Sequence, residues 1–128
     1  IESDATKTQD YLKINSPEEL TLLDQACGSG HILVYGFELL YRIYEEQGYN
    51  ASEIPALIIK HNLHGMEIDE RAAQLSSLSI LMKAREYQPR LFKKTEVPIP
   101  NITCYKDLAY TTNDIKDALT AAGIKISD

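Results

Sequence analysis

Hydrophobic and polar positions follow strand-like and helix-like patterns in turn along the chain. A short apolar run at 20–24 ends in Asp24 and predicts a buried strand. From about Gly30 to Gln47, apolar residues recur every three or four positions, which predicts an amphipathic helix. On this helix we expect a buried face formed by Ile32, Tyr35, Leu39, Leu40 and Ile43, and a polar face formed by Glu38, Arg42, Glu45 and Glu46.

The rest of the chain continues this alternation. Ser52 is the expected cap of a second helix with Pro55 in its first turn. A second strand is predicted at 63–68, and Asp69 is the expected N-cap of a helix over 70–87 whose small residues Ala72, Ala73, Ser76 and Ser79 allow close backbone approach. A loop at 89–100, a strand at 102–105 and a helix at 113–122 follow, with Gly123 just past the helix end. This order predicts an α/β fold with a mostly parallel sheet.

Length and composition narrow the class of protein. The chain has 128 residues, 44% of them apolar and 25% charged, which suits one folded domain after a polar lead-in at 1–19. We find no apolar run long enough for a membrane span, and the polar first residues do not resemble a secretory signal. Two cysteines are too few for a disulfide framework, so we expect a cytoplasmic protein. The formal net charge of −6 argues against a surface that binds nucleic acid all round, and the basic segment 83–94 suits a solvated helix end better than phosphate contact.

Candidate chemistry gathers where the predicted strands end. The first strand ends at Asp24 and a glycine-rich turn, the second at Glu67 and Asp69, and Asp107 follows the third. Ligands of open parallel sheets bind at the carboxyl ends of the strands. Carboxylates accept hydrogen bonds from hydroxyls and amines, and glycines let backbone N–H groups approach an anionic group. A nucleotide-like ligand with ribose hydroxyls and an exocyclic amine would suit this edge.

Several familiar nucleotide and metal sites do not fit the spacing. The dinucleotide fingerprint requires a third glycine, and Leu33 stands at that position, so a pyrophosphate site is disfavoured. No Gly-Lys-Ser/Thr follows the glycines, which excludes a P-loop, and the histidines lack zinc-ligand spacing with the cysteines. The alternatives for the glycine turn and for Glu67 are a turn chosen for packing and a solvated strand end. For Asp69, helix capping is preferred over ligand contact.

Two segments carry a family resemblance. Residues 24–33, Asp-Gln-Ala-Cys-Gly-Ser-Gly-His-Ile-Leu, closely resemble the first motif of adenine-specific (N6) DNA methyltransferases. Residues 63–69, Leu-His-Gly-Met-Glu-Ile-Asp, resemble their second motif. The stretch 18–88 as a whole is most similar to large modification enzymes of phage-defence systems, of the BREX type or the fused restriction-modification type. A Rossmann-like, S-adenosylmethionine-dependent methyltransferase fold is implied.

The resemblance also implies site roles. The first loop would hold the methionine part of S-adenosylmethionine through Asp24, Ala26, Cys27, Gly28 and Gly30. Glu67 would bind the ribose hydroxyls, Ile68 would pack on the adenine ring, and Asp107 would accept from the adenine amine. No metal is implied. Gln25 departs from the family, which usually has proline there.

A further departure is the catalytic motif. The family's Asn/Asp-Pro-Pro-Tyr/Phe is missing, since the five prolines are never adjacent. We therefore interpret 20–128 as the cofactor-binding half of a methyltransferase domain that is inactive alone, with DNA held by other parts of the intact enzyme. Without a fourth strand the first strand would have a bare edge, which predicts self-association. The alternatives are a non-catalytic nucleotide-binding or sensing module and a structural module without a ligand.

Overall fold

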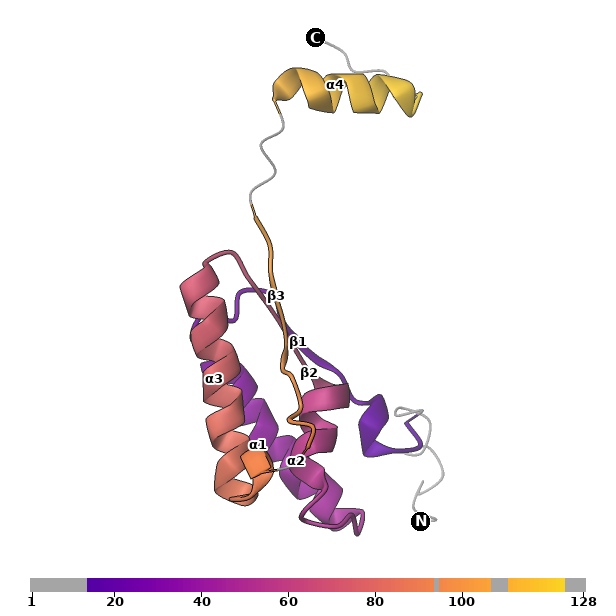
Figure 1. Ribbon diagram of the computed structural model, residues 1–128. Helices are drawn as coiled ribbons and strands as arrows, with labels where there is room; N and C mark the ends of the chain where they lie inside the picture. Colours follow the sequence, from indigo (N-terminus) through magenta and orange to yellow (C-terminus); the bar gives the residue numbers. More distant parts are fainter. Residues whose placement is uncertain (1–13, 94, 107–110, 124–128) are drawn as a thin grey trace, which may run out of the picture.

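The computed structural model describes residues 14–93, 95–106 and 111–123, which form a small α/β unit with a further helix (Figure 1). The elements, in chain order, are the short 3-10 helix η1 (Pro17–Glu19), β1 (Leu22–Asp24), α1 (His31–Glu46), α2 (Ile54–Leu57), the π-helical turn η2 (Ile58–Asn62), β2 (Leu63–Glu67), α3 (Glu70–Tyr87), the 3-10 turn η3 (Leu91–Lys93), β3 (Asn101–Cys104) and α4 (Thr112–Ala121). The predicted order of strands and helices is confirmed.

The three strands form one parallel sheet in the order β1-β2-β3. Asp24 pairs in register with Gly65, and Glu67 pairs with Cys104, so the strands end along one common edge. Helices α1 and α3 lie on the same side of the sheet (Figure 1). The α/β class with a parallel sheet is therefore confirmed, and the arrangement is consistent with part of a Rossmann-like methyltransferase fold.

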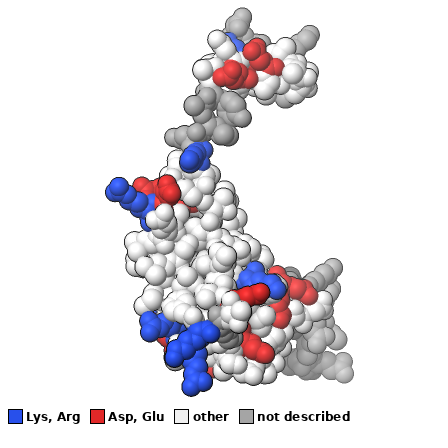
Figure 2. Space-filling view, in the orientation of Figure 1, with Lys and Arg blue, Asp and Glu red and all other residues white. Residues whose placement is uncertain are grey.

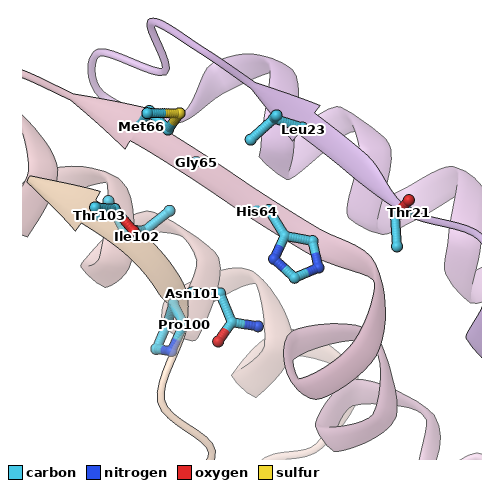
Figure 3. Close-up of a pocket in the computed structure, with 9 residues that line it drawn as sticks. All are labelled: Thr21, Leu23, His64, Gly65, Met66, Pro100, Asn101, Ile102 and Thr103. Atoms are coloured by element: carbon cyan, nitrogen blue, oxygen red, sulfur yellow. The ribbon is translucent and has the colours of Figure 1, made fainter. Parts of the chain in front are cut away.

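The opposite face of the sheet is open among the described residues. A groove of about 750 Å³ crosses it. Leu23, His64 and Met66 extend into this groove from β1 and β2, in front of the helices (Figure 3). Leu23 is 51% exposed, so the expectation of a buried first strand was wrong for this residue. Alternate strand residues point to opposite faces, and only the face of Leu22 packs against the core.

The predicted buried face of α1 was also wrong. Ile32 and Tyr35 are more than 60% exposed, and Leu39 and Ile43 are also exposed, whereas only Leu40 of the predicted set is buried. The residues that face the sheet and α3 are Leu33, Gly36, Phe37, Leu40, Tyr41 and Tyr44. The helix carries two apolar stripes. The inner stripe packs on the core residues Leu63, Ile80 and Ala84, and its Tyr41 ring stacks on Tyr87 of α3 at a centroid distance of 4.1 Å.

Helix ends show which local predictions succeeded. Asp69 caps α3 as expected, since its Oδ1 accepts a hydrogen bond from the Ala72 N–H at 2.8 Å. Helix α4 starts with a capping box between Thr111 and Asp114, and Gly123 follows it with a φ of 76°. Ser52 is not the cap of α2, because the N-cap position is Glu53 and no side chain caps that helix.

Asn62 is a buried polar side chain that ties the start of the chain to the core. Its amide Nδ2 donates to the carbonyl oxygens of Pro17 and Leu20 at 2.7 and 2.6 Å, and its Oδ1 accepts from the Tyr44 hydroxyl at 2.9 Å. Burial is the main cause that raises the pKa of Tyr44 to about 12. The side-chain amide of Asn62 thus joins two parts of the protein. Its N–H groups hold η1 and the residue Leu20 before β1, and its oxygen is bonded to Tyr44 of α1.

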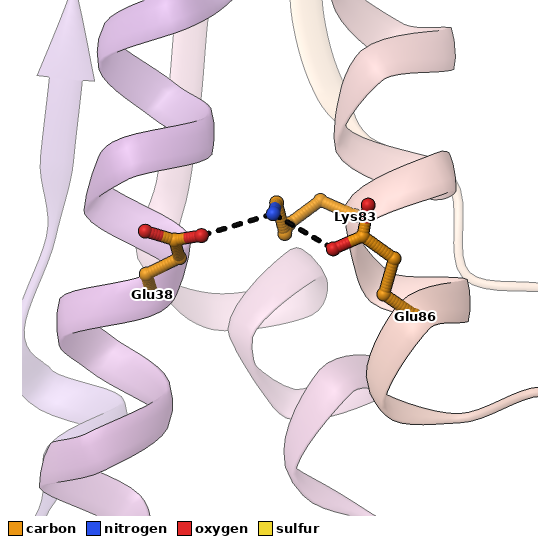
Figure 4. Close-up of polar contacts among 3 residues, drawn as sticks. All are labelled: Glu38, Lys83 and Glu86. Atoms are coloured by element: carbon orange, nitrogen blue, oxygen red, sulfur yellow. Dashed lines mark hydrogen bonds and ion pairs between the residues drawn. The ribbon is translucent and has the colours of Figure 1, made fainter.

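Lys83 links α3 to α1 (Figure 4). Its Nζ lies 2.9 Å from Glu38 Oε1 and 2.8 Å from Glu86 Oε2, and these two carboxylates raise the pKa of Lys83. Lys83 is therefore paired with two carboxylates of the protein. Of the cations in the basic segment 83–94, this one is not available for phosphate contact. Figure 2 shows charged side chains gathered toward the ends of the molecule, with an uncharged surface between them. Among the described helices none has the length and apolarity to cross a membrane.

Candidate cofactor-binding site

The loop after β1 turns the chain sharply into α1. The Ala26 N–H donates to Asp24 Oδ1 at 3.1 Å, and the Gly30 N–H donates to the Cys27 carbonyl at 2.7 Å. Gly28 and Gly30 have φ values of 51° and 88°, in the left-handed region where a side chain is strained. The glycines of the first motif are therefore required by the shape of this turn.

Two hydrogen bonds fasten this loop to β2. The Cys27 N–H donates to the Met66 carbonyl at 3.0 Å, and the Gly28 N–H donates to Glu67 Oε2 at 2.8 Å. Gly28 and Glu67 are 39 positions apart in sequence. The structure thus brings the glycine loop and the strand-end carboxylate to the same edge of the sheet, where the sequence predicted that both would lie.

The Glu67 carboxylate is a strong acceptor. Besides the Gly28 N–H, it accepts from the N–H groups of Ile68 and Asp69 on Oε1 at 2.9 and 3.1 Å. Hydrogen bonds from the backbone N–H of Asp69, then of Gly28 and Ile68, lower the pKa of Glu67 below its ordinary value. The group is therefore ionised at neutral pH. A carboxylate has about four acceptor positions, and three N–H groups use three of them.

The N-terminus of α1 faces the same edge. Its N-cap residue is Gly30, which forms no side-chain cap. The first N–H groups of a helix have no partner within the helix, and the helix dipole adds a partial positive charge there. An anionic group of a ligand would be favoured beside this turn.

Cys27 packs behind the loop. It is 5% exposed, and a Cβ placed on Gly65 would lie 3.1 Å from Cys27 Sγ and 2.6 Å from Ile102 Cδ1. Gly65 therefore lets the loop lie against β2. Gly65 was not among the predicted site residues, although a glycine inside a strand is a signal of close approach.

The remaining predicted residues occupy different positions. Asp24 and Ala26 lie at the start of the loop, where the Ala26 N–H donates a hydrogen bond to Asp24 Oδ1. Ile68 is 50% exposed directly after Glu67, so its side chain is accessible to a planar ligand. Asp69 is used as a helix cap. Asp107 lies outside the described residues, although the chain after β3 starts beside the site, where the Tyr105 N–H donates to the Glu67 carbonyl at 3.0 Å.

The groove on the open face of the sheet is not a candidate for this chemistry. Its lining contains no carboxylate, lysine or arginine and consists of Thr21, Leu23, His64, Gly65, Met66, Pro100, Asn101, Ile102 and Thr103. The strand-end site, in contrast, combines an ionised carboxylate, a glycine turn and a helix N-terminus. We therefore assign the candidate site to the edge formed by 24–30 and 67–68.

Comparison with known proteins gives three relatives. BrxX of Escherichia coli O9:H4, an adenine-specific methyltransferase, is 51% identical over 75 residues, which is 59% of this chain and 6% of the relative. PglX of Lacticaseibacillus casei, also an adenine-specific methyltransferase, is 40% identical over 90 residues, 70% of this chain and 8% of the relative. A putative type II restriction enzyme and methyltransferase of Methanocaldococcus jannaschii is 30% identical over 92 residues, 66% of this chain and 8% of the relative.

These relatives are much longer proteins, since the matched region spans less than a tenth of each. No family model matches the chain. Identities of 51% over 59% of the chain and 40% over 70% of it are nevertheless far above chance resemblance. The resemblance that the two motifs indicated is confirmed, and the chain is homologous to a segment of the adenine-specific methyltransferases BrxX and PglX.

Proposed function

We propose that this chain forms the S-adenosylmethionine-binding part of a cytoplasmic DNA methyltransferase that modifies adenine at N6. The observation that carries the proposal is the hydrogen bond from Gly28 N–H to Glu67 Oε2, which joins the glycine loop and the carboxylate at one sheet edge. Homology to adenine-specific methyltransferases supports the reaction class. A role of the intact enzyme in phage defence or restriction-modification belongs to the same proposal.

The residue types at this edge support the proposed cofactor. The Glu67 carboxylate would accept hydrogen bonds from the ribose hydroxyls, and the exposed Ile68 side chain would pack on the adenine ring. The loop from Asp24 through Ala26, Cys27 and Gly28 to Gly30 would surround the methionine part, with the α1 N-terminus beside its carboxylate. Asp107 is our proposal for the amine contact. When bound, S-adenosylmethionine would supply the electrophilic methyl group.

The chain's own contribution is binding and orientation. The residues that would polarise the adenine amine and stack on the flipped base belong to the Asn/Asp-Pro-Pro-Tyr/Phe motif, which is not in this sequence. We therefore propose that DNA contact and methyl transfer need other parts of the enzyme. Incubation of the chain with adenine-containing DNA and radiolabelled S-adenosylmethionine is expected to give no labelled DNA. Turnover above the no-protein control would refute this part.

Binding is tested by titrating the 128-residue chain with S-adenosylhomocysteine in a calorimeter. We expect saturable binding, and we expect Glu67→Ala to weaken it about tenfold or more, because hydrogen bonds to a charged acceptor are lost. Since three N–H donors lower the pKa of Glu67, its contribution should persist to a pH below that at which an ordinary glutamate becomes protonated.

Glu70→Gln is the matched control for Glu67→Ala. Glu70 is an exposed carboxylate three positions further on, in the first turn of α3. We expect it to leave the dissociation constant unchanged, and circular dichroism will show whether each variant is folded. Absence of binding by the wild-type chain at millimolar ligand, or equal affinity of Glu67→Ala, would refute the proposed site.

We also propose that the chain self-associates through β1. Among the described strands, β1 pairs only with β2, so its other edge is free, and Leu23 beside it is 51% exposed. Sedimentation velocity over a rising concentration series is expected to show a dimer, and Leu23→Lys should shift the chain to monomer because a charge on an edge strand opposes pairing. A monomer at every concentration would contradict the proposal.

A further inference from the structure

Ser76 has a buried hydroxyl without a hydrogen-bond partner. Its side chain lies on the inner face of α3 and is 0% exposed, and its Oγ has no partner among the described residues. Two other serines of α3 behave differently: Ser77 Oγ donates to the Ala73 carbonyl at 3.1 Å, and Ser79 Oγ donates to the Leu75 carbonyl at 2.9 Å. A buried hydroxyl without a partner destabilises the state in which it is found. Ser76 therefore needs an explanation that its neighbours do not.

The hydroxyl lies against the end of the glycine loop. A Cβ placed on Gly30 would be 2.7 Å from Ser76 Oγ and 3.1 Å from Ser76 Cα. Gly30 is the N-cap residue of α1 and provides no capping side chain. The unpartnered hydroxyl and the uncapped start of α1 are thus neighbours, on the side of the loop that faces α3.

The loop is also held by a hydrogen bond that a ligand would affect. Glu67 Oε2 accepts from the Gly28 N–H, and the same carboxylate also accepts two further N–H bonds. Under the proposed function, on which this step rests, ribose hydroxyls add two donors to a carboxylate with about one free acceptor position. Competition for these acceptor positions would lengthen the Gly28 bond and shift the turn from Cys27 to Gly30 slightly.

We propose that Ser76 is a positioning residue for this loop. When the nucleoside ligand is bound, the Ser76 hydroxyl donates a hydrogen bond to a backbone carbonyl oxygen of the turn at Gly30. That bond holds the start of α1 in the geometry that the ligand requires. Ser76 acts through the loop and does not touch the ligand. This bond would satisfy the buried hydroxyl, which has no partner among the described residues.

The test compares Ser76→Ala with Ser77→Ala in the 128-residue chain, using S-adenosylhomocysteine as the probe. For Ser76→Ala we expect the dissociation constant to rise about three- to tenfold, the effect of one hydrogen bond. Without ligand, we expect its thermal midpoint to stay unchanged or to rise, since no bond is lost. Ser77→Ala should leave the dissociation constant unchanged. Ser76→Cys, which keeps a weak donor of similar size, should restore part of the affinity.

The outcomes separate three cases. A lower midpoint for Ser76→Ala with an unchanged dissociation constant means that Ser76 serves packing alone, which overturns the inference. Wild-type binding that depends on Glu67 but not on Ser76 overturns the inference and leaves the proposed function standing. Failure of the wild-type chain to bind the probe refutes the proposed function and, with it, the role of Ser76.

Discussion

Gly30→Ala is expected to lower the free energy of unfolding by about 2–4 kcal/mol. The φ of Gly30 is 88°, which strains any residue with a Cβ, and the new methyl group would lie 2.7 Å from Ser76 Oγ. The free-energy costs of backbone strain and of steric overlap with α3 therefore add. Urea unfolding followed by circular dichroism measures the loss, and we expect S-adenosylhomocysteine binding to be weakened as well, because the loop must shift.

Gly48→Ala separates the two contributions to this loss. Gly48 has a similar φ of 80°, but a Cβ there would meet no atom within 4 Å. We expect this variant to lose only about 1–2 kcal/mol, the strain of the left-handed backbone. In a Ser76→Gly background, Gly30→Ala should lose less than in the wild type, since the overlap with Oγ is removed. Equal losses for Gly30→Ala and Gly48→Ala would contradict close packing of the loop on α3.

Asn62→Asp is expected to destabilise the protein by about 4 kcal/mol, although it changes the shape of the side chain little. The Asn62 amide donates two hydrogen bonds, to the carbonyl oxygens of Pro17 and Leu20. An aspartate oxygen in that place repels both carbonyls and buries a charge without a partner. Chemical denaturation at neutral pH measures the effect.

The pH dependence of Asn62→Asp identifies the cause. Burial raises the pKa of a carboxyl, so the loss relative to wild type should be smallest below about pH 3, where the group is neutral in both the folded and the unfolded chain. The loss should grow as the pH rises. Tyr44→Phe is the matched control, since it removes the single hydrogen bond to Asn62 Oδ1, and we expect a loss of about 1–2 kcal/mol without this acid dependence. A neutral effect of Asn62→Asp would contradict the observed network.

Local signals were sufficient for much of the fold. Asp69 before a helical pattern, Gly123 after one, and a short apolar run followed by glycines each act within a few residues of chain. The structure places helix α3 over Glu70–Tyr87, the range that the sequence predicted. Such features are predictable because capping, turn conformation and periodicity depend on neighbours in sequence.

The buried face of helix α1 could not be predicted from local signals. Two apolar stripes follow its surface, and periodicity alone favoured the stripe of Ile32 and Tyr35, which is exposed. The buried stripe contains Phe37 and Tyr41, whose rings meet Tyr87 at centroid distances of 5.8 and 4.1 Å. The choice depends on a partner that lies in a different helix. Asn62 is a similar case, because its polar side chain is buried only through carbonyl oxygens more than 40 positions away.

For the candidate site, the chain itself determined the glycine turn, the carboxylate after the second strand and the methyltransferase resemblance. The tertiary structure decided three contacts. The Gly28 N–H donates to Glu67, Cys27 packs against Gly65, and Ser76 packs against Gly30. These contacts join residues far apart in sequence. They arise only when β1 and β2 pair in register and α3 packs beside α1, so no local pattern encodes them.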